Sequence, residues 1–184
     1  MRILLAVGLT LLACLLAGLY GAAHNQISYT VSPEYFTRFK FAQFRIPSGT
    51  PERLGAAIVG WRAAYRMGTL VALFTVTPAL LAPGVRGMTI AALRGMAIAT
   101  GVTLAVGLLA LAVAFVVIDE TNVGDVRRFG DRIGDAVPFW RAGAMHNFSY
   151  LGGALGSLVG CVATVRSARR LSRSASPEDD ENPT

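Results

Sequence analysis

Four long apolar segments constrain this 184-residue chain more than any other feature. They cover about residues 3–23, 54–82, 88–118 and 146–165. Each is long enough to cross a hydrocarbon core of about 30 Å as an α-helix. Charged residues make up 15% of the chain, against about 25% in soluble domains, which argues against a soluble globular enzyme. We therefore expect an all-α fold, a four-helix transmembrane bundle formed as a single domain by residues 1–165.

The first apolar segment has two interpretations. Its length of about 21 residues exceeds the roughly 7–15 residues of a signal-peptide core, so we expect a retained membrane span. Gly21 and Ala23 form a small-x-small pattern before His24. That pattern leaves a cleaved signal peptide as the alternative.

Four spans place both termini on the same side of the membrane. The tail, residues 166–184, begins with arginines and ends with acids and prolines, which is typical of a disordered segment. Because these arginines follow the last span directly, the positive-inside rule favours two cytoplasmic termini. We expect a multi-pass protein of the inner (plasma) membrane. Its net charge of +6 then reflects contact with anionic lipid rather than with nucleic acid.

The two outer segments of this topology are polar and aromatic. Ser32, Pro33 and Glu34 supply an N-cap, a first helical residue and an acid in the first turn. Five aromatic residues follow between positions 35 and 44. The second outer segment has three apolar residues at helical spacing, Val126, Phe129 and Ile133. We expect interfacial helices in both outer loops.

Small residues at helical spacing predict how the spans pack. Gly152, Gly156 and Gly160 form such a row in the last span, and small side chains let membrane helices approach closely. A compact bundle within one chain is the first interpretation, and a self-association face of a homo-oligomer is the alternative. The cysteines, Cys14 and Cys161, fall at different depths of their spans and are not expected to form a disulfide.

The two histidines stand in a near-repeat, His24-Asn25-x-x-Ser-Tyr and His146-Asn147-x-Ser-Tyr. Imidazole is a common metal ligand and a proton carrier at neutral pH. The topology places the carboxylates of Glu34, Asp119 and Glu120 on the same membrane face. A divalent metal held by these five residues, or a haem held by the two histidines, is the functional hypothesis. The alternative is that His, Asn, Ser and Tyr cap helices at the interface.

Two arginines near the start of the second span form another candidate site. Arg62 and Arg66 share one helical face. An unpaired charge within a membrane is expensive, so we expect an ion pair with Asp119 or Glu120. A site for an anion or a lipid headgroup is the alternative.

The segments His24–Phe44 and His146–Gly153 resemble signature blocks of a family of small bacterial four-span membrane proteins. That family has no established activity. The resemblance therefore implies a bacterial membrane protein and nothing about catalysis.

No complete catalytic set and no phosphate-binding loop is present in the sequence, so we lean against an enzyme. The first hypothesis is an accessory or interaction subunit whose aromatic outer loops bind a membrane protein partner. The second is the metal or haem site, with a possible redox role. The third is a small permease or channel, which the few polar residues within the spans make harder to build.

Overall fold

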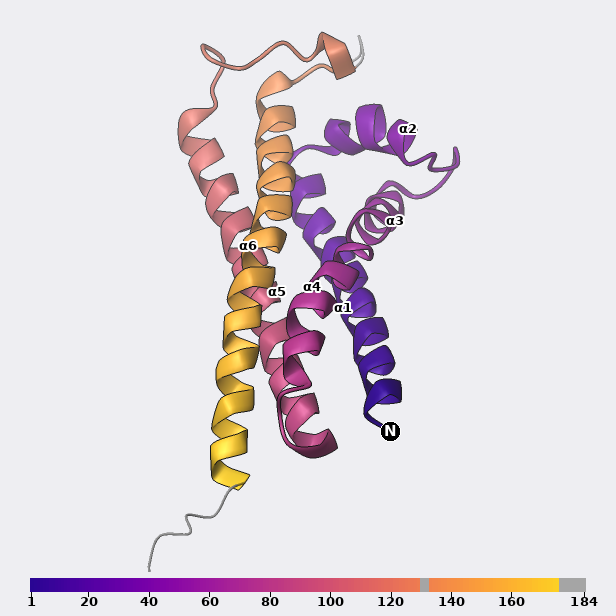
Figure 1. Cartoon of the computed structure of the whole chain (residues 1–184). Helices are drawn as coiled ribbons and strands as arrows, with labels where there is room; N and C mark the ends of the chain where they lie inside the picture. The colour runs from indigo at the N-terminus through magenta and orange to yellow at the C-terminus, as the bar shows by residue number, and fades with distance from the viewer. Residues whose placement is uncertain (130–132, 176–184) are drawn as a thin grey trace, which may run out of the picture.

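The computed structural model describes residues 1–129 and 133–175, and these residues form helices and connecting loops without a strand. Three helices are long and apolar enough to cross a membrane: α1 (Arg2–Val31), α5 (Gly84–Val117) and α6 (Ala136–Ala175). The expectation of an all-α fold is confirmed. Met1 and the end of α6 lie at the same end of the molecule (Figure 1).

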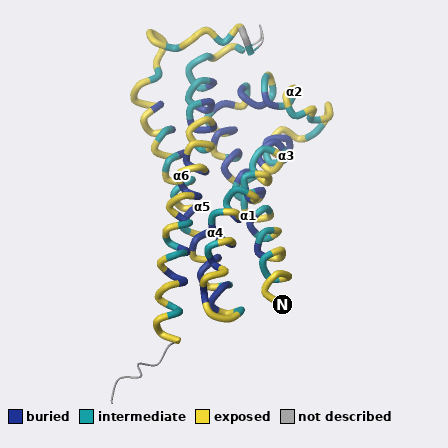
Figure 2. The backbone as a smooth tube through the Cα atoms, in the orientation of Figure 1, coloured by how far each residue is buried: buried dark blue, intermediate teal, exposed yellow. Residues whose placement is uncertain are grey.

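Large apolar side chains face outward along the long helices, as expected for a protein surrounded by lipid. Leu4, Leu109 and Val116 are 78%, 66% and 84% exposed. Figure 2 shows such exposed positions along α1, α5 and α6, with buried positions turned toward the neighbouring helices. Because exposed apolar area of this extent is rare on soluble monomers, the pattern indicates a membrane protein.

The expected second span is not one helix, and a four-helix bundle is therefore not confirmed. The chain forms α3 (Glu52–Ala64) and α4 (Met67–Ala79), separated by a turn at Tyr65 and Arg66. At 13 residues each, neither helix alone reaches the roughly 20 residues that a span needs.

Glycines on both sides of this turn explain the bend. A Cβ on Gly60 in α3 would collide with the backbone of Gly21 in α1, and a Cβ on Gly68 in α4 would collide with the backbone of Cys14. Both halves therefore press their backbones against α1. The turn at Tyr65 and Arg66 allows both α3 and α4 to make a close backbone contact with α1.

Helix α1 is longer than expected and ends at Val31, so the block from His24 to Tyr29 is helical rather than a loop. Ser32 then accepts a hydrogen bond from the backbone N–H of Tyr35 at 3.2 Å, as predicted for an N-cap. The helix that follows is a six-residue π-helix, η1 (Tyr35–Lys40), continued by the short α2 (Phe41–Gln43). A π-helix is rare and often marks a functional region.

The small-residue row of α6 packs against α5 within the same chain. A Cβ on Gly156 would lie 2.5 Å from the carbonyl oxygen of Ala99, and one on Gly160 would lie 2.7 Å from that of Gly95. A Cβ on Gly152 would lie 3.0 Å from the side chain of Val106. This contact supports the bundle interpretation. Both cysteines are free, as expected.

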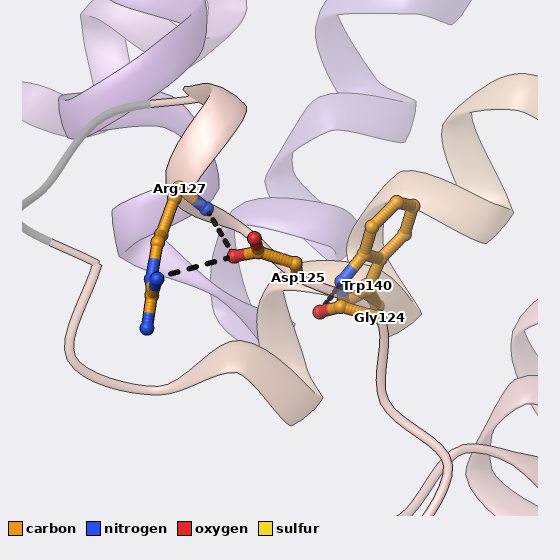
Figure 3. A network of polar contacts seen from close by, with 4 residues as sticks. All are labelled: Gly124, Asp125, Arg127 and Trp140. Atoms are coloured by element: carbon orange, nitrogen blue, oxygen red, sulfur yellow. Dashed lines mark hydrogen bonds and ion pairs between the residues drawn. The ribbon is translucent and has the colours of Figure 1, made fainter.

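Helix α6 extends beyond the expected span at both ends. Residues 166–175, which we expected to be disordered, are its last turns, and residues 176–184 lie outside the described residues. In the described part of the second outer loop, a 3-10 turn, η2 (Arg127–Phe129), is formed, and residues 130–132 of the expected amphipathic helix lie outside the described residues. Figure 3 shows how this loop is fastened: Trp140 donates to the carbonyl of Gly124 at 2.7 Å, and Asp125 accepts from the backbone of Arg127 at 2.8 Å.

The aromatic residues of the two outer loops form one internal cluster. Its buried members include Tyr35, Phe36 and Phe139, and Phe39 and Phe129 pack against them. The Phe39 and Phe129 ring centroids are 4.9 Å apart. The cluster covers the end of the bundle away from the termini, and these rings contact one another rather than forming an open surface.

Candidate functional site

The two histidines of the chain lie next to each other inside the bundle. The centroids of the His24 and His146 rings are 6.3 Å apart, and each residue is only 5% exposed. They meet because α1 and α6 run antiparallel, so that the last third of α1 faces the first third of α6 (Figure 1). The near-repeat in the sequence thus marks one site and not two.

Ser149 connects the two helices through His24. Its Oγ lies 2.7 Å from His24 Nε2 and donates to the carbonyl of Met145 at 2.8 Å. A hydroxyl has one proton to donate, so with that proton on Met145 the bond to His24 requires an N–H on Nε2. Gly107 of α5 closes this site, because a Cβ there would collide with Ser149 Oγ and lie 3.4 Å from His24 Nε2.

His146 has one nitrogen bonded and one free. Its Nε2 lies 3.1 Å from the hydroxyl of Tyr150, whereas its Nδ1 is buried without a hydrogen-bond partner among the described residues. The hydroxyl of Tyr20, whose ring lies 5.6 Å from that of His24, is buried in the same way. An unsatisfied buried polar group costs about 1–3 kcal/mol. Two such groups close together indicate a place where a ligand or water completes the structure.

Lys40 lies at the outer side of this pair, in an aromatic surrounding. It is 8% exposed, and its ammonium donates to the side-chain carbonyl of Gln43 at 3.0 Å. The same group lies 4.6 Å from the centroid of the Phe39 ring and 5.4 Å from that of Tyr35. Burial lowers the pKa of Lys40 to about 8, so the charged form still predominates at neutral pH.

Tyr35 stands between Lys40 and the histidines. The centroids of the Tyr35 and His146 rings are 5.8 Å apart. Burial raises the pKa of Tyr35, so its hydroxyl keeps its proton. Lysine, tyrosine and histidine therefore form a continuous row from the aromatic cluster to the interior of the bundle.

A cavity of about 80 Å³ begins at the histidines and continues between α1, α3, α4, α5 and α6. At roughly 10–15 Å³ per water molecule, it has room for several. Its polar end is formed by His24, His146, Ser149, Tyr20 and Tyr150, and its remaining wall is mainly apolar. Apolar lining residues include Leu16, Met67, Val71 and Met96.

The cavity is open on part of its surface. Two of its lining residues, Tyr150 and Leu16, are 42% and 40% exposed. Both belong to helices that are long and apolar enough to cross a membrane.

The structure does not gather the five residues of the predicted metal site. Among the residues it describes, no group of three or more His, Cys, Asp or Glu side chains is placed to hold a metal ion. Glu34 instead accepts hydrogen bonds from the backbone of Gly134 and Asp135, at 3.0 and 3.1 Å. It therefore holds the two residues that precede α6, next to the helix N-terminus, where a negative charge is favourable.

The other two acids also lie apart from the histidines. Asp119 accepts from the backbone and hydroxyl of Thr121 at 2.8 and 2.6 Å. These hydrogen bonds lower the pKa of Asp119. Glu120, the next residue in this loop after α5, is exposed. Ligation of a metal or haem through the Nε2 atoms would displace the contacts of His24 with Ser149 and of His146 with Tyr150.

The arginine pair has other partners than those expected. Arg62 donates to the carbonyl of Phe44 at 3.0 Å. Arg66 donates to the hydroxyl of Tyr65 at 3.0 Å. The predicted ion pair with Asp119 or Glu120 is not formed. Both arginines lie at the exposed face of the turn between α3 and α4, away from the cavity.

Sequence reasoning identified the histidines but missed three residues of the site. Lys40 is the only lysine of the chain, and its aromatic neighbours on both sides are the signal that the sequence offers for it. Tyr35 is one of five aromatic residues between positions 35 and 44 and has no distinguishing pattern. The position of Gly107 beside Ser149 depends on a contact that no spacing reveals.

No family model, curated protein or solved structure matches this chain. The resemblance of its two histidine blocks to small bacterial membrane proteins stays a prediction. The cavity and its lining residues are the features of the structure that bear on function.

Proposed function

We propose that this chain is an integral membrane protein that binds a small amphipathic molecule between its helices, without performing chemistry on it. The cavity carries the proposal: one end is lined by imidazole and hydroxyl groups, and the rest is apolar. Sites of this composition fix a polar head by a few hydrogen bonds and accept an apolar body. The unpartnered Nδ1 of His146 and hydroxyl of Tyr20 are the groups that a head would satisfy.

In this proposal α3 and α4 together act as the broken second of four spans, which places both termini in the cytoplasm and the aromatic cluster outside. The same-end position of Met1 and the α6 C-terminus supports an even number of crossings (Figure 1). The arginines that end α6 support a cytoplasmic side by the positive-inside rule. We assign the protein to the inner membrane on this basis.

A protein partner bound by the aromatic loops, our first hypothesis from the sequence, has less support. Tyr35 and Phe36 are 4% and 0% exposed, so the rings that would recognise a partner are already packed. If the protein has an accessory role, we infer that it depends on the cavity and not on the aromatic loops. The protein would then hold or sense the ligand that the cavity binds.

Photolabelling tests the proposal. The purified chain in phospholipid nanodiscs is irradiated with a diazirine on a ten-carbon amphiphile, and labelled peptides are mapped. We expect saturable labelling of the cavity residues Met67 and Met96. Val71→Phe fills the cavity and should abolish this labelling. Leu73→Phe, on the same helix and 60% exposed, should not. Equal labelling of both variants would contradict a cavity-bound ligand.

A further inference from the structure

The polar end of the cavity is rich in hydrogen-bond donors and lacks an acid. Each neutral histidine has one N–H to donate, and each tyrosine one O–H. The carboxylate of Glu34 is used at the start of α6, and that of Glu52 accepts from the hydroxyl of Tyr29. No acidic residue lines the cavity.

The tautomer of His146 sets the role of its unpartnered nitrogen. We assign the tautomer in which the hydroxyl of Tyr150 donates to Nε2, so that the neutral ring carries its proton on Nδ1. That N–H is buried and bonds to nothing among the described residues. The buried hydroxyl of Tyr20 also has a proton to donate. Both residues belong to the lining of the cavity, and in this tautomer an acceptor is the missing partner of both groups.

The nearest buried charge is positive. Among the described residues no carboxylate forms an ion pair with Lys40, whose contacts are an amide oxygen and two aromatic rings. The Tyr35 ring contacts both Lys40 and His146: its centroid lies 5.4 Å from the ammonium and 5.8 Å from the centroid of the His146 ring. A cation entering the cavity would be repelled, whereas an anion would be attracted across a region of low dielectric constant.

We propose that the cavity binds the carboxylate head of a single-chain, fatty-acid-like amphiphile. The head accepts hydrogen bonds from His146 Nδ1 and from the hydroxyl of Tyr20, and Lys40 supplies the balancing charge. The chain runs along the apolar wall and leaves through the opening near Leu16. A cavity of about 80 Å³ encloses the head and the first carbons only, so the rest of the chain lies in the bilayer.

This inference rests on the proposed function, and three probes with the same chain separate the two. Radiolabelled dodecanoate, dodecanol and dodecylammonium are equilibrated with the full-length protein in phosphatidylcholine nanodiscs. Partition into lipid is subtracted with the Val71→Phe variant. We expect saturable binding of one dodecanoate per chain, at least about tenfold tighter than that of the other two probes, as one charge–charge contact in a partly buried site implies.

Variants at Lys40 test the charge directly. Lys40→Met should weaken dodecanoate binding about tenfold and leave dodecanol binding unchanged, while Lys40→Arg should retain most of the affinity. Thermal unfolding of each variant shows whether it is folded. Dodecanol or dodecylammonium bound as tightly as dodecanoate would overturn the carboxylate assignment and leave the cavity proposal intact. Saturable binding of none of the three probes would overturn both.

Discussion

A methyl group at Gly107 tests the geometry on which the site depends. In Gly107→Ala the new Cβ meets Ser149 Oγ, and it lies 3.4 Å from His24 Nε2. The serine cannot rotate away without giving up its bonds to His24 and to the Met145 carbonyl. The substitution therefore either breaks the His24–Ser149 bond that joins α1 and α6 or pushes α5 away from both helices.

The magnitude follows from three contributions. Overpacking a well-packed site costs about 1–3 kcal/mol, and the lost His24–Ser149 hydrogen bond costs about another 0.5–1.5 kcal/mol. Replacing a helical glycine by alanine returns up to about 1 kcal/mol. Gly101→Ala is the matched control, since Gly101 lies in the same helix with nothing within 4 Å of the position of a Cβ. The two variants should differ by about 2–4 kcal/mol in unfolding free energy.

Reversible unfolding in mixed micelles measures this difference in unfolding free energy. Ser149→Ala serves as a second variant, because it removes the oxygen that the new methyl group contacts. The double variant Gly107→Ala/Ser149→Ala should be more stable than the sum of the two single effects predicts. Additive effects, or a Gly107→Ala protein as stable as Gly101→Ala, would refute the close packing of Gly107 on the His24–Ser149 pair.

Other parts of the structure give independent predictions. Burial lowers the pKa of Lys40 from 10.5 to about 8. Between pH 8 and 10.5 the unfolded chain therefore binds more protons than the folded chain, and the unfolding free energy rises with pH. Lys40→Met should remove this rise when denaturant unfolding is measured at a series of pH values. Glu34→Gln should cost about 0.3–1 kcal/mol in the same assay, because it removes a charge at the start of α6. Gly60→Ala should lower the unfolding midpoint well below that of Gly101→Ala, because its Cβ meets the backbone of Gly21.

The apolar segments predicted three of the long helices because length and hydropathy are local properties. The break between α3 and α4 was not predictable in this way. It depends on the contacts of Gly60 and Gly68 with the backbone of α1, which involve residues about 40 and 55 positions away. The same limit applies to the segment before α6, because Glu34 of a distant loop accepts hydrogen bonds from Gly134 and Asp135 there.

The candidate site was predictable in its residue types and not in its arrangement. The sequence marked His24 and His146 by their matching neighbours, and the structure shows that they meet. It also suggested acids as co-ligands on the basis of a shared membrane face. Residues on one membrane face need not be neighbours, and the carboxylate of Glu34 instead accepts a hydrogen bond from the backbone N–H of Gly134, close to the start of α6. The burial of Lys40, which is 8% exposed, was not predictable, because it depends on packing between the outer loops and the helices.

Nitrogen NMR of the histidines tests the central claim most directly, because the chain has only two. Nitrogen-15 histidine is incorporated into the protein in nanodiscs, and His146→Asn assigns the signals. Addition of dodecanoate should shift the His146 Nδ1 signal saturably, while His24 keeps its proton on Nε2, and Val71→Phe should show no shift. An unchanged His146 signal, or the same shift in Val71→Phe, would contradict a ligand held by the histidines in this cavity.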